Sequence, residues 1–278
     1  MIDLHCHSTA SDGLLPPAEV VAAAAEAGLM AVALTDHDTM AGLPAAREAA
    51  ARLGVEVIGG CEFSVGVAWG EMHLLAYFIE SGDPAIEACL ADARNDRVRR
   101  ANAMVSRIAG LGLPLTVDDV HAEASGGAVG RPHVARALHR HGHVPTVQAA
   151  FDRYIGRGRP AFVEKELPAF RTVAELVHAC GGVVSAAHLK SYGTVTHLER
   201  LRSEGLDAVE TRHPSHHGDT LATITEAALA LDLARTGGSD WHGETDPAGT
   251  HATLGSQHVP DEWLVALRAR AARRAGAR

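Results

Sequence analysis

Two histidines near the start of the chain, His5 and His7, have a spacing that suits metal binding. Residues 2–7 are expected to form a short strand, because apolar residues lead into a turn rich in Ser, Asp and Gly. Side chains alternate along a strand, so His5 and His7 should point to one side while Cys6 points to the other. Two imidazoles on one side can grip a divalent cation, and Asp12 in the following loop could add a carboxylate. A lone His-x-His is weak evidence, so the site depends on ligands elsewhere in the chain.

Further histidines and carboxylates lie at or near the ends of other apolar segments. The side chains that we assign as metal ligands are His5, His7, Asp12, His37, Glu62, His73, His133, Asp240 and His242. A set this large, without cysteine, exceeds what one tetrahedral zinc requires and suits two or three ions. Mn²⁺, Fe²⁺ and Zn²⁺ all accept such nitrogen and oxygen ligands. Asp36 and Asp38 flank His37 and are expected to orient ligand imidazoles.

These residues would be positioned by strands that alternate with helices. Glu62 is expected just after the end of a strand over residues 55–58, and His73 within a strand over 71–78. Such an order is typical of a parallel sheet or barrel, in which functional residues gather at the carboxyl ends of the strands. The other expected strands cover 2–7, 30–34, 183–187 and 208–210, and the expected helices cover 16–27, 43–53, 172–180, 198–204, 221–231 and 261–274.

The alternation stops near Gly82, and residues 83–160 are expected to form a helical insertion over the barrel mouth. The helical stretches would cover 83–112, 117–141 and 146–155, and the barrel would comprise 1–82 and 161–278. The first stretch contains Arg94, Arg97, Arg99 and Arg100 among apolar residues. These arginines either form a solvated helix face or line an anion pocket.

Composition narrows the class of protein. The chain has 278 residues, 46% of them hydrophobic and 21% charged, which is typical of a globular protein. No apolar run is as long as a membrane span, and four cysteines without CxxC spacing favour reduced thiols in the cytoplasm. The net charge of −9 argues against an unspecific nucleic-acid coat, and stable duplex binding is not expected. An anionic substrate remains compatible with this charge, because bound divalent ions reverse the local sign.

Seven short motifs together resemble the polymerase-and-histidinol-phosphatase (PHP) family of metal-dependent phosphoesterases. They are Asp3-Leu4-His5-Cys6-His7 with Ser11-Asp12-Gly13, Thr35-Asp36-His37-Asp38, Gly60-Cys61-Glu62, Met72-His73, Arg131-Pro132-His133, Ala187-His188 and Ser239-Asp240-Trp241-His242. The resemblance covers residues 1–80 and 160–250 and one ligand of the insertion. It implies an α/β fold, a distorted (β/α)7 barrel with three metal ions at the C-terminal face.

The resemblance also distributes the ligands among the ions. It implies a first ion on His5, His7, Glu62 and Asp240, a second on Asp12, His37 and His242, and a third on Glu62, His73 and His133. Some members have histidine at the position of Asp12. A carboxylate there is a harder ligand, which favours Mn²⁺ over Zn²⁺ or Fe²⁺.

Such a centre would lower the pKa of a bridging water and hold the phosphoryl oxygens for in-line attack. Arg131, His188 and His213 are candidates to hold the phosphate, His188 also to protonate the leaving oxygen, and Asp36 is grouped with the catalytic residues. Alternative roles are a buried structural histidine for His188, a surface loop residue for His213 and a helix-capping or paired arginine for Arg131. Arg157 and Arg159 lie between glycines and either bind phosphate or belong to a solvated turn.

Within the family, a compact barrel with this insertion resembles the stand-alone group. That group removes the 3′-phosphate of nucleoside 3′,5′-bisphosphates and trims short oligoribonucleotides 5′→3′. The substrate is accordingly expected to be a small anionic phosphate ester, a nucleotide in the first instance. A histidinol-phosphate phosphatase, an amidohydrolase acting on C–N bonds and a non-catalytic remnant are the alternatives, although the full ligand set argues against the last.

Overall fold

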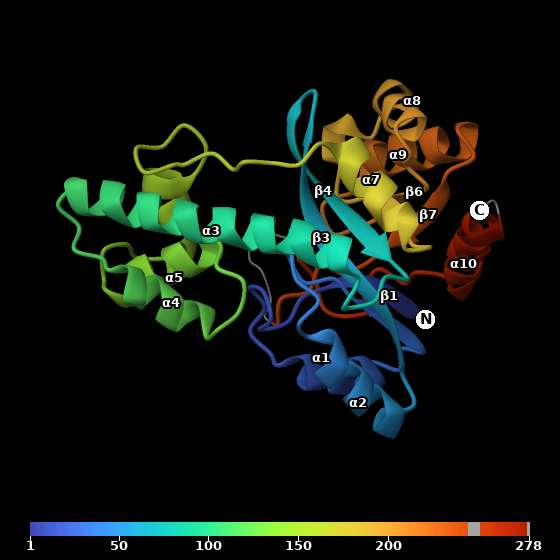
Figure 1. Ribbon diagram of the computed structural model, residues 1–278, viewed down its shortest axis with the longest axis horizontal. Coiled ribbons are helices and arrows are strands. Elements are labelled where there is room, and N and C mark those ends of the chain that lie inside the picture. The colour runs from blue at the N-terminus through green and yellow to red at the C-terminus, as the bar shows by residue number, and fades with distance from the viewer. Residues whose placement is uncertain (244–250, 277–278) are drawn as a thin grey trace.

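The computed structural model describes residues 1–243 and 251–276, which contain seven strands arranged as a nearly closed barrel (Figure 1). The strands are β1 Ile2–Cys6, β2 Ala31–Leu34, β3 Glu56–Val67, β4 Gly70–Tyr77, β5 Val183–Ala186, β6 Ala208–Arg212 and β7 Ala234–Gly237, and they neighbour one another in chain order. The backbone after β7 meets β1, because Asp240 N donates to the His5 carbonyl at 2.9 Å and His7 N to the Trp241 carbonyl at 2.9 Å. The expected distorted barrel is confirmed.

Strand β3 is much longer than expected, and this changes the sheet from purely parallel to mixed. Its first residues pair in parallel with β2 up to Leu34↔Gly59, and the rest pair antiparallel with β4 from Gly60↔Tyr77 onward. β4 is also antiparallel to β5. The prediction that the strand ends at Ile58 and that Glu62 follows it is therefore wrong, since Glu62 lies inside β3. Gly60 allows the close pairing, because a Cβ there would lie 2.8 Å from the Ala76 carbonyl oxygen.

Halfway along strand β1, the regular alternation of side chains between the two sides of the sheet is interrupted. Ile2 and Leu4 belong to the inner apolar cluster, whereas Cys6 belongs to the cluster between the barrel and its helices. The pairing of β1 with β2 shifts register between Asp3 and Cys6, which is the signature of a bulge. Because of this shift, apolar side chains fill the barrel near the amino ends of the parallel strands. The histidines that follow point into the barrel near the carboxyl ends of those strands.

Helices cover the outside of the barrel and close it at the end where its parallel strands begin. The outer helices are α1 Pro17–Glu26, α2 Leu43–Leu53, α7 Phe170–Ala179, α8 Val195–Ser203 and α9 Gly218–Ala230. Helix α10, Asp261–Gly276, inserts Trp263 and Leu267 into the inner cluster near the starts of the strands (Figure 1). None of the helices in the described residues is long and apolar enough to cross a membrane.

The segment between β4 and α7 is helical and has an apolar core of its own. It contains α3 Pro84–Gly110, α4 Val117–Ala124, α5 Arg131–Arg140, α6 Val147–Ala150 and a π-helical turn, η1, Phe151–Ile155. The expected single stretch over 117–141 is wrong, because Ser125 and Gly126 have positive φ angles of 47° and 88° and end α4. The segment contacts the loop after β1, where Ala128 N donates to the Ala10 carbonyl at 2.9 Å.

Candidate metal centre

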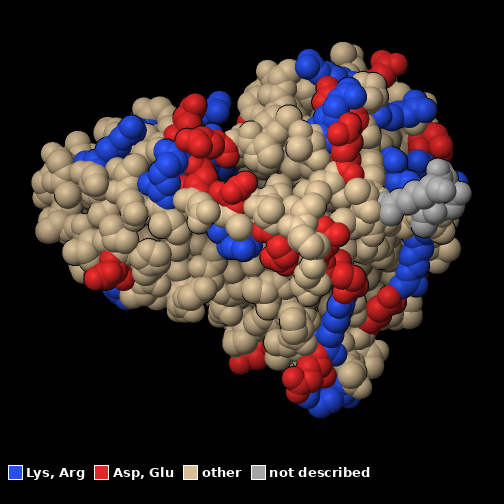
Figure 2. Space-filling view, in the orientation of Figure 1, with Lys and Arg blue, Asp and Glu red and all other residues tan. Residues whose placement is uncertain are grey.

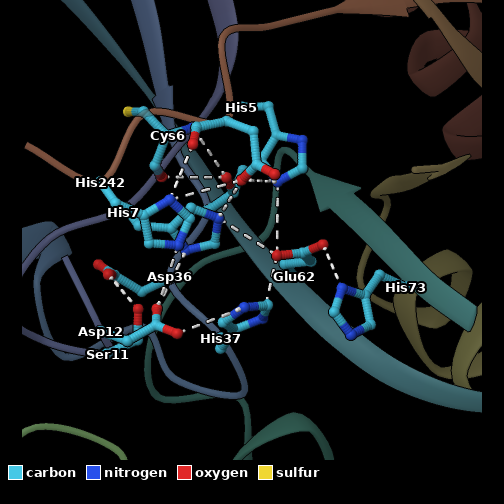
Figure 3. Close-up of polar contacts among 12 residues, drawn as sticks. His5, Cys6, His7, Ser11, Asp12, Asp36, His37, Glu62, His73 and His242 are labelled. Carbon is cyan, nitrogen blue, oxygen red and sulfur yellow. Dashed lines mark hydrogen bonds and ion pairs between the residues drawn. The ribbon is translucent and has the colours of Figure 1, made fainter. Parts of the chain in front are cut away.

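Glu62 is the centre of the site, because its two carboxylate oxygens face five imidazoles. Figure 3 shows Glu62 among His5, His7, His37 and His73. Oε2 lies 3.0 Å from His37 Nδ1, 3.2 Å from His7 Nε2 and 3.4 Å from His5 Nε2. Oε1 lies 2.8 Å from His73 Nδ1 and 3.0 Å from His188 Nε2. The position of Glu62 inside β3 explains this reach, since the barrel brings β1, β4 and the end of β5 to it.

Two further carboxylates extend the cluster on either side of the β1 histidines. Asp240 Oδ1 lies 3.3 Å from His5 Nε2 and 3.2 Å from His7 Nε2. Gly238 lets this segment approach β1, because a Cβ there would lie 2.4 Å from His5 Cβ. Asp12 Oδ1 lies 3.4 Å from His242 Nε2, and Asp12 Oδ2 lies 3.8 Å from His37 Nε2.

Several ligand atoms of the cluster lie close to one another but form no well-aligned hydrogen bond. Among the described residues, several buried atoms lack a hydrogen-bond partner: Nε2 of His5, both ring nitrogens of His7, Oδ1 of Asp12, Nδ1 of His37, Oε2 of Glu62 and Nδ1 of His73. Buried polar atoms are normally paired, so a group of orphans in one place indicates a missing partner. Their atoms converge within distances that a bound ion can bridge, and the donor set of imidazole nitrogen and carboxylate oxygen fits divalent cations.

The carboxylates of the cluster are held in their charged form. Burial would raise the pKa of Glu62, but His37 and His73 hold it well below its usual range. Burial would likewise raise the pKa of Asp12 and Asp240, and neighbouring imidazoles lower both. Burial alone would lower the pKa of His7, yet the adjacent carboxylates of Asp240 and Glu62 raise it to about 10. The buried negative charge of three carboxylates therefore attracts protons or metal ions, which compete for the same atoms.

His133 and His188 differ in how they meet Glu62. His133 lies in the first turn of α5 and is buried, and its Nδ1 accepts a hydrogen bond from Gly130 N at 2.8 Å. Burial lowers its pKa to about 4. Within the described residues it has no ion pair with Glu62, whereas His188 reaches the same oxygen of Glu62 as His73 does. The ring centroids of His73 and His188 are 5.1 Å apart, so His188 is a further candidate ligand beside Glu62.

Asp36 was expected to orient ligand imidazoles, but its hydrogen bonds go to the loop that carries Asp12. Its carboxylate accepts hydrogen bonds of 2.7 Å from Ser8 N, Ser8 Oγ and Ser11 Oγ (Figure 3). Asp38 instead accepts from Arg97 Nε at 2.7 Å, which ties α3 to the end of β2. Both aspartates therefore shape the backbone around the site.

The remaining predicted substrate residues fall into two groups. His213 lies beside the centre, buried, with Nε2 3.4 Å from Asp240 Oδ2. Arg131 lines a small cavity in the insertion together with Arg97, Arg100 and Gly130. Burial and the nearby charge of Arg97 lower the pKa of Arg131, so several cations are packed together. Outside this group, the exposed Arg157 approaches Gly70 of the β3–β4 turn, and Arg159 is exposed in the turn after η1.

One residue at the centre was not anticipated from the sequence. Glu210 is fully buried in the middle of β6, where Oε1 lies 3.0 Å from His5 Nδ1 and Oε2 accepts from His188 N at 2.8 Å. A carboxylate that holds the second nitrogen of a ligand histidine fixes the orientation of that ring. Its signal in the sequence was an acidic residue at the end of an apolar strand, Ala208-Val209-Glu210.

The chain is similar to several known proteins. Residues 3–225 match the PHP domain family. A 5′-3′ exoribonuclease of Haemophilus influenzae is 35% identical over 245 residues, which cover 86% of this chain and 89% of that relative. A 3′,5′-nucleoside bisphosphate phosphatase of Chromobacterium violaceum is 32% identical over 249 residues, 87% of this chain and 87% of that relative. A crystal structure from Bifidobacterium adolescentis, assigned as a metal-dependent phosphoesterase, has a TM-score of 0.89 and 31% identity and covers 97% of this chain and 96% of its own.

Proposed function

Because the chain belongs to the PHP domain family of metal-dependent phosphoesterases, we propose that it removes the 3′-phosphate of nucleoside 3′,5′-bisphosphates. Trimming of short oligoribonucleotides in the 5′→3′ direction is a second activity of the same site. The observation that carries the proposal is the convergence of orphaned imidazole and carboxylate atoms beside a group of buried arginines. The names of the two relatives, a bisphosphate phosphatase and an exoribonuclease, support the same substrate class.

The residues fit three divalent cations, for which Mn²⁺ is proposed because Asp12 adds an oxygen ligand. The first would be held by His5, His7, Glu62 and Asp240, the second by Asp12, His37 and His242, and the third by Glu62, His73 and His188. His188 replaces His133 in this set because of its distance to Glu62. When bound, such ions supply an activated water and neutralise phosphoryl charge.

The protein's own side chains would position the substrate. Arg131 has its guanidinium in a buried cationic group, where it suits the phosphate that is not cleaved. His213 adjoins Asp240 and suits an oxygen of the phosphate that is cleaved. In this proposal His188 is a metal ligand and not the proton donor, because its Nε2 cannot bind a cation and donate a proton at the same time.

The proposed location of the protein is the cytoplasm, and its proposed substrate is a small nucleotide. The net charge of −9 disfavours stable binding of duplex nucleic acid. On the face shown in Figure 2, basic and acidic side chains are interspersed and form no continuous basic band. A small substrate can still enter, because its recognition depends on the local arginines and cations.

The test compares four substrates with purified protein in the presence of Mn²⁺: adenosine 3′,5′-bisphosphate, a 5′-phosphorylated trinucleotide, histidinol phosphate and an N-acyl amino acid. We expect the first to have the highest kcat/KM for phosphate release, and excess chelator to abolish that release. Preference for histidinol phosphate would support the first alternative. Hydrolysis of the amide without any phosphate release would overturn the phosphoesterase assignment.

A further inference from the structure

Three aromatic rings form a cluster at the tip of the β3–β4 hairpin, and we call this cluster the aromatic rim. Trp69 lies in the turn of the hairpin and stacks on Tyr192, with ring centroids 5.8 Å apart and planes 13° apart. His197 meets both rings edge-on, at 4.5 Å from Trp69 and 5.5 Å from Tyr192. Segments that are distant in the sequence thus place a stacked aromatic pair at one point.

The aromatic rim is close to the metal centre. Trp69 is four residues before His73 on the same hairpin, which corresponds to about 13 Å at the usual rise of a strand. Tyr192 is four residues after His188, in the short helix η2, Lys190–Tyr192. Both rings therefore stand within a few nucleotides' length of Glu62, since stacked nucleotides rise by about 3.4 Å each.

The two stacked rings differ in exposure. Trp69 is partly buried against the apolar cluster between the barrel and its helices, whereas Tyr192, stacked on its accessible side, is 44% exposed. By contrast, Tyr77 is fully buried and Trp263 is 7% exposed. The chain has only three tyrosines and three tryptophans, so placing one of each at this edge uses a third of them. The neighbouring Val195, 46% exposed, enlarges the apolar surface.

Positive charge accompanies the aromatic rim. The Arg157 guanidinium lies against Gly70, the residue after Trp69, at 3.7 Å from the position a Cβ would take. Lys190 begins η2 and is exposed. An open aromatic surface flanked by cations is the combination that binds single-stranded nucleic acid, because any base can stack while the cations meet the phosphates.

We propose that the aromatic rim stacks a base of a single-stranded oligoribonucleotide whose 5′ end lies at the metal centre. The inference rests on the proposed function and names the feature that would extend it from mononucleotides to oligonucleotides. Arg157 and Lys190 contact the backbone of the strand that continues in the 3′ direction. The aromatic rim thereby raises the affinity for longer substrates and leaves the turnover of a nucleoside bisphosphate unchanged.

The experiment measures kcat/KM of Trp69→Ala and Tyr192→Ala with a 5′-phosphorylated pentaribonucleotide and with adenosine 3′,5′-bisphosphate. Loss of one stacked base predicts a decrease of about 5- to 150-fold for the pentamer and less than about twofold for the bisphosphate. Trp69→Phe and Tyr192→Phe should recover most of the pentamer activity, because they restore a ring. Leu229→Ala is the matched control, since Leu229 is 63% exposed on α9, outside the aromatic rim.

Pentamers with a single abasic nucleotide locate the contact. In the wild type one abasic position should lower kcat/KM, and in Trp69→Ala the same position should have no further effect. Equal losses for pentamer and bisphosphate, or no loss for the pentamer, would overturn the proposal. If the wild type hydrolyses neither substrate, the proposed function has failed. The stacking role is then tested separately by fluorescence anisotropy of a labelled phosphorothioate pentamer. Unchanged affinity in Trp69→Ala rejects the stacking role, and weaker affinity supports it.

Discussion

Glu62 concentrates the function of the site in one side chain, because all three proposed cations depend on it or on histidines that face it. We expect Glu62→Ala to lose most bound metal and at least about 100-fold in phosphate release, since loss of an orienting group alone costs 10–100-fold. Metal content by mass spectrometry and turnover with Mn²⁺ measure the two effects. Glu80→Ala is the matched control, because Glu80 is an exposed residue paired with Arg47. Near-wild-type metal content in Glu62→Ala would exclude the bridging role.

His188 and His133 offer a direct test of the third cation. His188→Ala should lower the metal content by about one equivalent, because its Nε2 lies 3.0 Å from Glu62. His133→Ala should retain the wild-type content, since His133 Nδ1 already accepts from Gly130 N. Both variants are compared by metal analysis after dialysis, with unfolding curves to confirm that they fold. The reverse result would restore the ligand set implied by the family resemblance.

Most of the centre could be predicted because its ligands follow buried segments in short, distinctive motifs. The sequence could not show which of two histidines completes a group, since His133 and His188 both follow apolar or glycine-rich stretches. That choice depends on where the insertion places α5. Glu210 was missed for a related reason: a single carboxylate in an apolar strand has no distinctive spacing until the barrel brings it to His5.

At the scale of elements, the order of strands and helices was predictable from periodicity and glycine positions, but the direction of β4 was not. Gly59 and Gly60 looked like the end of a strand, whereas they permit the chain to change from a parallel to an antiparallel neighbour. Pairing direction is set by contacts between segments that are distant in the sequence, and hydrophobic alternation carries no information on it. The break after Ala124 was missed because an amphipathic pattern continues on both sides of it.

Asp207 joins three elements and should control stability as a function of pH. Its carboxylate, 4% exposed, lies 2.8 Å from His178 Nε2 on α7 and 2.7 Å from Arg274 Nε on α10. Burial would raise its pKa, but the hydrogen bonds from His178, Val184 N and Arg274 lower it from 3.8. The ionised form therefore stabilises the fold above about pH 4, and this contribution is lost as the pH falls through the lowered pKa.

We expect Asp207→Asn to lower the free energy of unfolding by about 1–2 kcal/mol at pH 7, because it leaves the partly exposed His178 and Arg274 without the carboxylate that pairs with them. The deficit should shrink below pH 4, where the wild-type carboxylate also becomes neutral. Urea unfolding at pH 7, 4 and 3 measures it. Asp232→Asn, whose side chain is 95% exposed, is the control and should show no measurable change. A deficit that does not depend on pH would contradict the ionic contribution.

For the whole molecule, metal binding should be coupled to stability. Without cations, the buried carboxylates repel one another and several imidazole nitrogens have no hydrogen-bond partner. The metal-free protein is therefore less stable. Ligand at 100 times its dissociation constant adds about 2.7 kcal/mol for each site. We expect chelation to lower the Tm measured by calorimetry and Mn²⁺ to restore it, whereas Mg²⁺ at the same concentration restores less. An unchanged Tm would show that the cluster holds no ion.

The meeting of β1 with the segment after β7 also determines when the centre can form. His5 and His7 are made first on the ribosome, yet Asp240 joins them only after the last strand has been added and Gly238 has come against His5. Until then, the two imidazoles have only part of their partners and should bind cations weakly. The cations would therefore act after the barrel closes, so they would slow its opening more than they speed its formation. In the cell, the supply of metal would determine how long the folded protein persists, and the chain would reach its fold without it.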